Sequence, residues 1–177
     1  MSTQQNGRPG SGTTTPVHRL ASEKHLVVYS AEVNAPAEEL FALISDPQRH
    51  HELDGSGTVQ ARAVGPRELK TGDRFSVAMR VFGVPYRLPL LVLQAQQPSA
   101  QQAGVLEWVQ PTGHRWRWEM APVAGSPGRT QVTESYDARA QNRVARGALT
   151  LLRVYPRNAA GIRASLEKLQ RRFSEDA

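Results

Sequence analysis

The sequence predicts an α+β fold in which a curved antiparallel sheet of about seven strands wraps around a long C-terminal helix. From residue 144 to residue 173, apolar side chains recur at steps of three or four, which is the spacing of one helix face. Between residues 24 and 138 the chain consists mostly of short β-branched and aromatic runs bounded by Gly and Pro. Short connections favour antiparallel pairing of successive strands, so the expected order is strand, two helices, six strands and a long helix.

The N-terminal segment 1–20 is rich in Gly, Ser, Thr, Gln and Pro and is predicted to be a disordered tail. The folded domain is therefore expected to span residues 21–177. The segment lacks the apolar stretch of a signal peptide, and no run of eighteen apolar residues is present. These observations favour a cytoplasmic protein without a membrane span.

The first strand is predicted at residues 24–33, and a helix follows it. Pro36 lies at a typical helix start, and Glu38 and Glu39 complement the positive end of the helix dipole. Asp46 and Pro47 end this helix. One further helical turn is expected before the Gly-rich turn at 54–57.

The remaining strands and the final helix follow from the same patterns. Pro89 within a strand favours an edge position or a bulge. Pro156 predicts a kink or break in the final helix, with two roughly collinear segments. Segment 144–155 is expected to act as a lid and segment 162–173 to anchor the core. The predicted strands are 58–64, 73–82, 86–96, 105–109, 114–122 and 130–138.

Composition narrows the class of protein further. A chain of 177 residues suits one domain, and the absence of cysteine excludes disulfides and thiolate metal sites. The net charge is +6, and arginine supplies 19 of the 22 basic residues. Because these arginines are dispersed, they are interpreted as a solvated surface, and nucleic acid is not expected as a partner. The densest group is Arg139, Arg143, Arg146, Arg153 and Arg157, which leaves an acidic partner or lipid surface open.

The run VNAPAEELFALISDP at 33–47 and the closing SLEKL at 165–169 resemble the START-like helix-grip (SRPBCC) superfamily. Its members include birch-pollen-allergen-like proteins, START lipid-transfer domains and polyketide cyclase/dehydrase-like proteins. The resemblance covers about residues 24–174 and is nearest to the bacterial polyketide cyclase/dehydrase-like group. It implies a cavity for a hydrophobic molecule, and catalysis in only some members. Many members carry a tryptophan soon after Asp-Pro, which this chain lacks, and the resemblance assigns no role to the histidines found there.

An aromatic strand is the strongest candidate for a ligand-binding wall. His114, Trp116 and Trp118 alternate along it and share one face, with Trp108 on the neighbouring strand. Ordinary core packing explains the same pattern, so both interpretations stay open. The predicted pocket residues are Trp108, His114, Trp116, Trp118, Tyr86, Tyr136, Phe75, Met79, Tyr155 and Ile162.

Three residues are candidates for acid–base catalysis, namely His50, His51 and Glu134. Adjacent histidines point in different directions and no H-E-x-x-H spacing is present, so a metal site is not expected. A plain surface turn is the alternative interpretation of the two histidines. Glu134 either faces inward, where it needs a partner such as Arg62 or Arg87, or lies on the surface, which the pattern favours slightly.

Three functions remain open from the sequence. The favoured one is binding of a hydrophobic small molecule, a lipid, quinone or polyketide-like compound, between the sheet and the final helix. The alternative is an aromatase/cyclase-type enzyme acting on a polyketide-like carbonyl substrate. The third is an interaction module that uses the basic flank. No cofactor is expected, and the protein is expected to be a monomer or homodimer.

Overall fold

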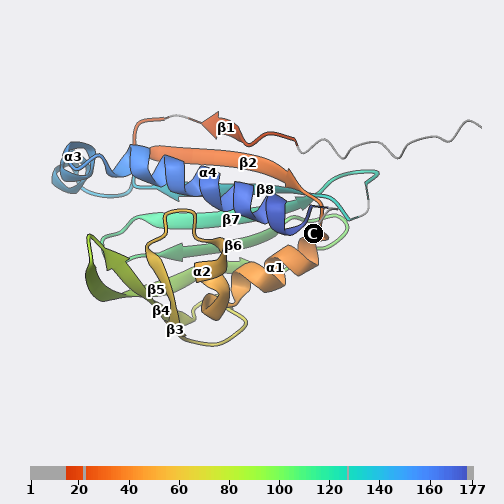
Figure 1. Ribbon diagram of the computed structural model, residues 1–177, viewed down its shortest axis with the longest axis horizontal. Coiled ribbons are helices and arrows are strands. Elements are labelled where there is room, and N and C mark those ends of the chain that lie inside the picture. The colour runs from red at the N-terminus through yellow and green to blue at the C-terminus, as the bar shows by residue number, and fades with distance from the viewer. Residues whose placement is uncertain (1–14, 22, 127, 175–177) are drawn as a thin grey trace, which may run out of the picture.

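The computed structural model describes residues 15–21, 23–126 and 128–174, which form an α+β fold. An eight-stranded antiparallel sheet has the order β1-β2-β8-β7-β6-β5-β4-β3, and the helices lie together on one face of it (Figure 1). The strands are β1 (His18–Ala21), β2 (Leu26–Val33), β3 (Val59–Val64), β4 (Arg74–Val81), β5 (Val84–Gln96), β6 (Gly104–Val109), β7 (Arg115–Pro122) and β8 (Thr130–Asp137). The helices are α1 (Ala37–Ser45), α2 (His50–Leu53), α3 (Arg143–Leu151) and α4 (Val154–Arg172), with a 3-10 turn at Pro47–Arg49. The predicted fold class is confirmed, and from β2 onward the elements follow the predicted order, with the final helix divided into α3 and α4.

The strand β1 was not expected from the sequence. It pairs with β2, His18 opposite Ser30 and Ala21 opposite Val28, and extends the sheet by one edge strand. The predicted tail 1–20 therefore ends too late, because residues 18–20 belong to the sheet. Residues 1–14 of that tail lie outside the described residues.

The helix α1 begins where the sequence indicates. Pro36 is extended at its N-cap, and Glu38 and Glu39 occupy its first turn. Asp46 ends the helix, and its Oδ1 accepts a hydrogen bond of 2.9 Å from the Gln48 amide, which starts the 3-10 turn. The buried side of α1 includes Leu40 and Ile44, so the helix closes one end of the space above the sheet.

Pro89 occupies a position where β5 is paired with a neighbouring strand on one side only. It lies opposite Ser76 of β4, whereas pairing of β5 with β6 begins only at Leu91. Because β5 extends beyond β6, the missing N–H of Pro89 costs no ladder hydrogen bond on that side. The expected edge position is thus confirmed within a strand that is otherwise central.

The C-terminal helix is broken near Pro156, but not at it. Leu152 and Arg153 separate α3 from α4, and Arg153 adopts a left-handed conformation with φ 54°. Pro156 lies in the first turn of α4, where its missing N–H is tolerated. Figure 1 shows α3 end-on and α4 lengthwise, so the expectation of two collinear segments is wrong. The left-handed conformation of Arg153 turns the chain more sharply than a kink at Pro156 would.

The C-terminal part of α4 anchors the core, as predicted. Ile162, Leu166 and Leu169 are at most 1% exposed and pack against the sheet and α2. In contrast, α3 contains no buried residue. The expected difference between an anchor and a loosely packed segment is therefore visible in burial, while a lid motion of 144–155 stays a prediction.

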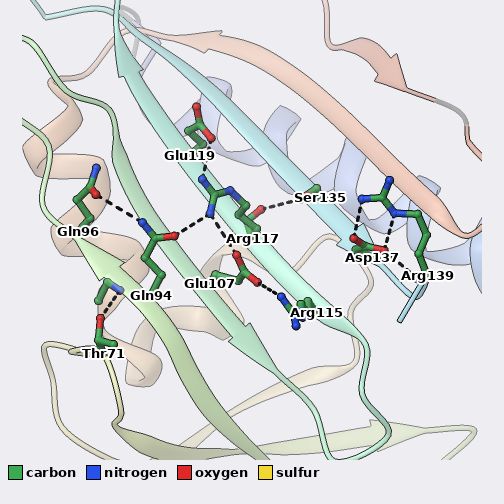
Figure 2. A network of polar contacts seen from close by, with 11 residues as sticks. Thr71, Gln94, Gln96, Glu107, Arg115, Arg117, Glu119, Ser135, Asp137 and Arg139 are labelled. Atoms are coloured by element: carbon green, nitrogen blue, oxygen red, sulfur yellow. Dashed lines mark hydrogen bonds and ion pairs between the residues drawn. The ribbon is translucent and has the colours of Figure 1, made fainter. Parts of the chain in front are cut away.

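The sheet has a polar face turned away from α4. Arg117 of β7 contacts Glu107 of β6 at 3.1 Å, Glu119 at 3.2 Å and Gln94 of β5 at 3.1 Å (Figure 2). Arg115 adds a second contact to Glu107 at 3.3 Å. Since side chains alternate along a strand, the residues between these point to the opposite face, where the cavity lies. Part of the high arginine content is therefore used in ion pairs across the outer face.

A small loop crosses α4 at close range. The Gly55 amide donates to Ser165 Oγ over 3.0 Å, and Lys168 Nζ donates to the Asp54 carbonyl. Asp54 Oδ2 accepts from the Val59 amide at 2.8 Å, which leads the chain into β3. Small residues on α4, such as Gly161, let the two backbones approach. This loop closes the cavity on the side of α2.

Candidate functional site

A cavity of about 770 Å³ lies between the concave face of the sheet and α4. This volume falls in the range of small-molecule sites, roughly 300–1,000 Å³. Strands β3 to β8, the segment 50–58 and the first half of α4 form its walls. The sequence-predicted residues that line it are His50, Met79, Tyr86, Trp108, His114, Trp116, Trp118, Glu134, Tyr136 and Ile162.

The aromatic wall comes from three neighbouring strands. Trp116 lies opposite Trp108 of β6 and opposite Tyr136 of β8, so the three rings form a row across the sheet. The Trp116 and Tyr136 rings meet edge to face with centroids 5.0 Å apart. Trp118, two residues further along the same face of β7, is only 5% exposed. Both sequence interpretations apply, because these rings are packed into the core and also line the cavity.

Glu134 faces inward. On β8 it alternates with outward side chains and lies opposite Trp118 of β7 and Tyr29 of β2. It is 4% exposed, and its Oε2 has no hydrogen-bond partner among the described residues, so neither Arg62 nor Arg87 meets this atom. The surface orientation that the pattern favoured slightly is therefore wrong.

Burial changes the protonation of Glu134. Desolvation raises the pKa of its carboxyl well above the ordinary value, and the nearby Asp54 carboxylate raises it further, while the Ser165 hydroxyl offsets part of the effect. The raised pKa favours the protonated form of the carboxyl over the ionised form. In that form Glu134 offers one O–H donor and an acceptor inside an apolar space.

Two more polar groups lie in the same wall. Tyr136 is 1% exposed and its hydroxyl has no hydrogen-bond partner within the described chain. Burial raises the pKa of this phenol, so it stays neutral. His114 contacts Gln110 Oε1 and the Gln141 side-chain nitrogen, and burial lowers its pKa to about 4. A neutral imidazole, a phenol and a carboxyl with a raised pKa thus share one largely apolar cavity.

The two adjacent histidines of α2 point to different surroundings. His50 stacks on Trp108 with centroids 5.2 Å apart and contacts the edge of Phe75 at 5.6 Å. Its Nε2 lies 2.8 Å from the Ile44 carbonyl oxygen, so Nε2 carries the proton and Nδ1 carries a lone pair. Burial lowers the pKa of this imidazole and keeps it neutral. His50 therefore lies in the cavity with the properties of a base.

His51 and Glu52 lie on the other side of α2. His51 Nδ1 is 3.0 Å from the Gln48 carbonyl oxygen, and the residue does not line the cavity. Glu52 is held by Arg49 at 3.0 Å and Arg172 at 2.6 Å, which lower the pKa of its carboxyl to about 2. The structure thus separates the histidine–carboxylate group that the sequence brings together.

Two of the predicted pocket residues, Phe75 and Tyr155, do not line the cavity, and a third, Tyr86, lies at its edge. Phe75 supports the cavity from behind, because it packs against His50 and Trp108 without lining the space. Tyr155 lines a separate surface groove, where its hydroxyl lies 2.7 Å from His25 Nδ1. Tyr86 is 44% exposed and belongs to the mouth of the cavity. Phe75 and Tyr155 are therefore removed from the lining.

Sequence reasoning predicted that the final helix lines the cavity, but it missed the small residues of α4 and the crossing loop. Small side chains of α4 face the cavity at Gly161, Ala164 and Ser165, and segment 54–58 closes its side. Small residues spaced three and four apart on a helix leave room beside it, and this spacing was the available signal. The aliphatic lining residues Val59, Val77, Leu88 and Leu90 were also missed.

The described residues contain no cluster of three or more histidine, aspartate or glutamate side chains placed to hold a metal ion. A helix of sufficient length and apolarity to cross a membrane is likewise absent from that part of the chain.

Sequence comparison identifies relatives over most of the domain. The family described as "Polyketide cyclase / dehydrase and lipid transport" matches residues 24–174. "Uncharacterized protein Rv0088" of Mycobacterium tuberculosis is 44% identical over 151 residues, 82% of this chain. The chain spans only 62% of the length of that relative.

Solved structures share the fold at low sequence identity. A protein from Rhodobacter sphaeroides has a TM-score of 0.63 at 15% identity, covering 88% of this chain and 96% of the other. The ZhuI aromatase/cyclase from Streptomyces sp. R1128 has a TM-score of 0.55 at 13% identity, covering 86% and 97%. With this helix-grip architecture and a family match over residues 24–174, the chain belongs to the polyketide cyclase/dehydrase and lipid transport family.

Proposed function

We propose that the protein binds a neutral, hydrophobic small molecule that carries a carbonyl or hydroxyl group. The observation that carries this proposal is the cavity of about 770 Å³, largely apolar and aromatic in its walls, with unpaired polar atoms of Glu134 and Tyr136 buried in it. A buried polar atom without a partner costs about 1–3 kcal/mol. A ligand oxygen that pairs with these atoms removes that cost.

The chemistry of the walls limits the ligand. A charged carboxylate or phosphate group beside Glu134 and Asp54 would be unfavourable in this apolar space, so the part of the ligand that lies there is expected to be neutral. Trp108 and Trp116 offer ring faces and edges to a flat or aliphatic body. Quinones, polyketide-like aromatics and neutral lipids all meet these conditions.

Ligand binding is expected to change the tryptophan fluorescence of the protein. The measurement is a titration with a panel of quinones, aromatic polyketones and neutral lipids, together with native mass spectrometry of the purified protein for a co-purified molecule. In Ala164→Phe, a ring added to the half-buried cavity side of α4 is expected to weaken binding at least tenfold. The matched control is Ala42→Phe on the exposed side of α1.

A binding function is contradicted if the whole panel leaves the emission unchanged and the native mass shows the bare chain. Equal affinities of Ala164→Phe and the wild type for a ligand found in this way would place its site elsewhere.

An aromatase/cyclase activity is the second candidate, and a specific observation favours it. His50, with a lone pair on Nδ1, and Glu134, with a protonated carboxyl, line the same cavity. In an aldol cyclisation, His50 would accept the proton from a carbon between two carbonyls. That carbon bonds to a distant carbonyl carbon, and Glu134 donates its proton to the carbonyl oxygen. The proton on His50 then returns to Glu134, and loss of water from the ring follows.

Glu134→Gln and His50→Gln are each expected to lower kcat for a poly-β-ketone substrate by about 10²–10⁴-fold, the usual contribution of a positioned acid or base. His51→Gln is the matched control, because His51 lies on the other side of α2. Turnover that survives both changes would leave binding as the function.

A further inference from the structure

The short helix α3 exposes an apolar face. Val144, Ala148 and Leu151 are spaced four and three apart and so lie on one side of it. Val144 is 84% exposed and Leu151 83%, and Leu152, just past the helix, is 67% exposed. Leu149, on another side, provides the packing of α3 against the core. The apolar side of α3 is therefore presented to the surroundings rather than to the sheet.

The tip of the β4–β5 hairpin is also apolar. Phe82 and Gly83 form a two-residue turn between Val81 and Val84, with φ of 50° and 81°. This conformation favours Gly, Asn or Asp, and a bulky aromatic residue is unfavourable there. Phe82 is nevertheless 87% exposed, so its ring gains little burial in return. Local conformation does not explain a phenylalanine at this position, and the only cation–π partner of its ring among the described residues is Arg157.

These two surfaces lie at the same end of the molecule, near the mouth of the cavity. The Arg157 guanidinium lies 5.0 Å from the centre of the Phe82 ring, which joins the hairpin tip to the start of α4. Arg157 also lines the cavity together with Tyr86 and Val154. Figure 1 shows α3 and the turn of the hairpin at the same end of the molecule. We call the exposed apolar residues of this end, Phe82, Val84, Val144, Leu151 and Leu152, the docking face.

The charge around the docking face is mainly positive. Segment 138–166 contains six arginines and no aspartate or glutamate, and only Arg139 and Arg163 of these pair with carboxylates outside the segment among the described ion pairs. Arg143, Arg153 and Arg157 are exposed within it. A second copy of the chain is disfavoured as occupant, because a two-fold dimer would bring these arginines together. Apolar side chains ringed by arginine are typical of helices that lie in the interface of an anionic bilayer.

We propose that the docking face binds the surface of an anionic phospholipid membrane, with its apolar residues in the acyl boundary and its arginines on lipid phosphates. This orientation turns the mouth of the cavity towards the bilayer. Docking itself needs no molecule in the cavity, so it can be tested independently of the ligand.

The full chain is expected to co-sediment with vesicles of phosphatidylcholine containing 30% phosphatidylglycerol, and to bind pure phosphatidylcholine vesicles at least tenfold more weakly. Leu151→Glu/Leu152→Glu is expected to reduce binding at least tenfold, while Val64→Glu, at a 56% exposed apolar position on β3, retains it. Arg143→Glu and Arg153→Glu are each expected to weaken binding about fivefold or more. Arg62→Glu on β3 is the matched charge control, since Arg62 is also exposed. The substituted side chains are exposed, so unchanged circular dichroism is expected for every variant.

Equal binding of wild type and Leu151→Glu/Leu152→Glu to anionic vesicles overturns the proposal, as does equal binding to neutral and anionic vesicles. Absence of vesicle binding, together with a dimer in sedimentation velocity that the double variant dissociates, assigns the face to a second copy and also overturns it. Loss of ligand binding with vesicle binding intact concerns only the cavity.

Discussion

Gly55→Ala is expected to lower the free energy of unfolding by about 3 kcal/mol, because the loop and α4 meet there backbone to backbone. A methyl group on Gly55 would lie 2.2 Å from the Gly161 carbonyl oxygen and 2.3 Å from the Ser165 amide nitrogen. Neither backbone atom can rotate away as a side chain could, so the loop or the helix must shift. The shift also breaks the hydrogen bond of 3.0 Å from the Gly55 amide to Ser165 Oγ.

The measurement is urea unfolding followed by circular dichroism. Gly147→Ala is the matched control, since no atom lies within 4 Å of an added methyl group at that position in α3. This control is expected to be more stable than wild type by about 0.5–1 kcal/mol, because alanine favours helix. A Gly55→Ala protein with wild-type stability would show that the loop does not press against α4. Ligand affinity should fall with stability, since Gly55 and Ser165 both line the cavity.

Glu134→Gln is expected to stabilise the protein relative to wild type at pH 8, with a difference that shrinks towards pH 5. Burial raises the pKa of the folded-state carboxyl well above its ordinary value of 4.5. Above that value the unfolded chain loses the proton while the folded chain keeps it. Wild-type stability therefore falls as pH rises, by up to about 1.4 kcal/mol per pH unit, until the folded carboxyl ionises. Glutamine keeps the shape and does not titrate.

Two buried histidines have the opposite effect on stability, because they lower the stability of the fold as the pH falls. Burial lowers the pKa of His50 and His114, so they destabilise the fold as pH falls below about 6.5. Both remain in Glu134→Gln, and the difference between variant and wild type removes their contribution. Glu38→Gln, at an exposed position in the first turn of α1, is the control and should give a profile parallel to wild type. A constant difference between Glu134→Gln and wild type from pH 5 to pH 8 would contradict a protonated carboxyl in the cavity.

The opposite effects of this substitution on stability and function also separate the proposed functions. If Glu134→Gln stabilises the fold but impairs ligand binding or turnover, Glu134 contributes to function rather than to stability. Weaker ligand binding in Glu134→Gln with unchanged rate constants points to recognition. Loss of turnover at unchanged ligand affinity points to acid catalysis.

Local patterns predicted the strands well because their side chains alternate. Seven predicted strands correspond to β2 to β8, and the inward face of β7 follows from alternation alone. The edge strand β1 was missed because four residues inside a polar segment carry too little pattern. Its hydrogen bonds to β2 hold it in place, and a local sequence window does not contain that partner.

Site residues were predicted where one strand carries several of them, as at Trp116 and Trp118. They were misjudged where a single residue decides the orientation. Glu134 lies on a strand with polar residues on both faces, so alternation could not distinguish inside from outside. His50 and His51 are separated by one helical step, which is enough to place one against Trp108 and the other beside Gln48.

By itself, the sequence determined the fold class, the element order, the family and the presence of an aromatic inner strand. Periods of two and of three to four residues are local properties, and they decide which face of each element is apolar. Only the tertiary structure decided which groups share the cavity. His50, Trp108, Glu134 and Ser165 are far apart in the chain and line it together. Whether these residues come together depends on how α4 and the loop at Gly55 pack against the sheet. That packing also leaves the apolar side of α3 exposed, although in the sequence it continues the apolar stripe of α4.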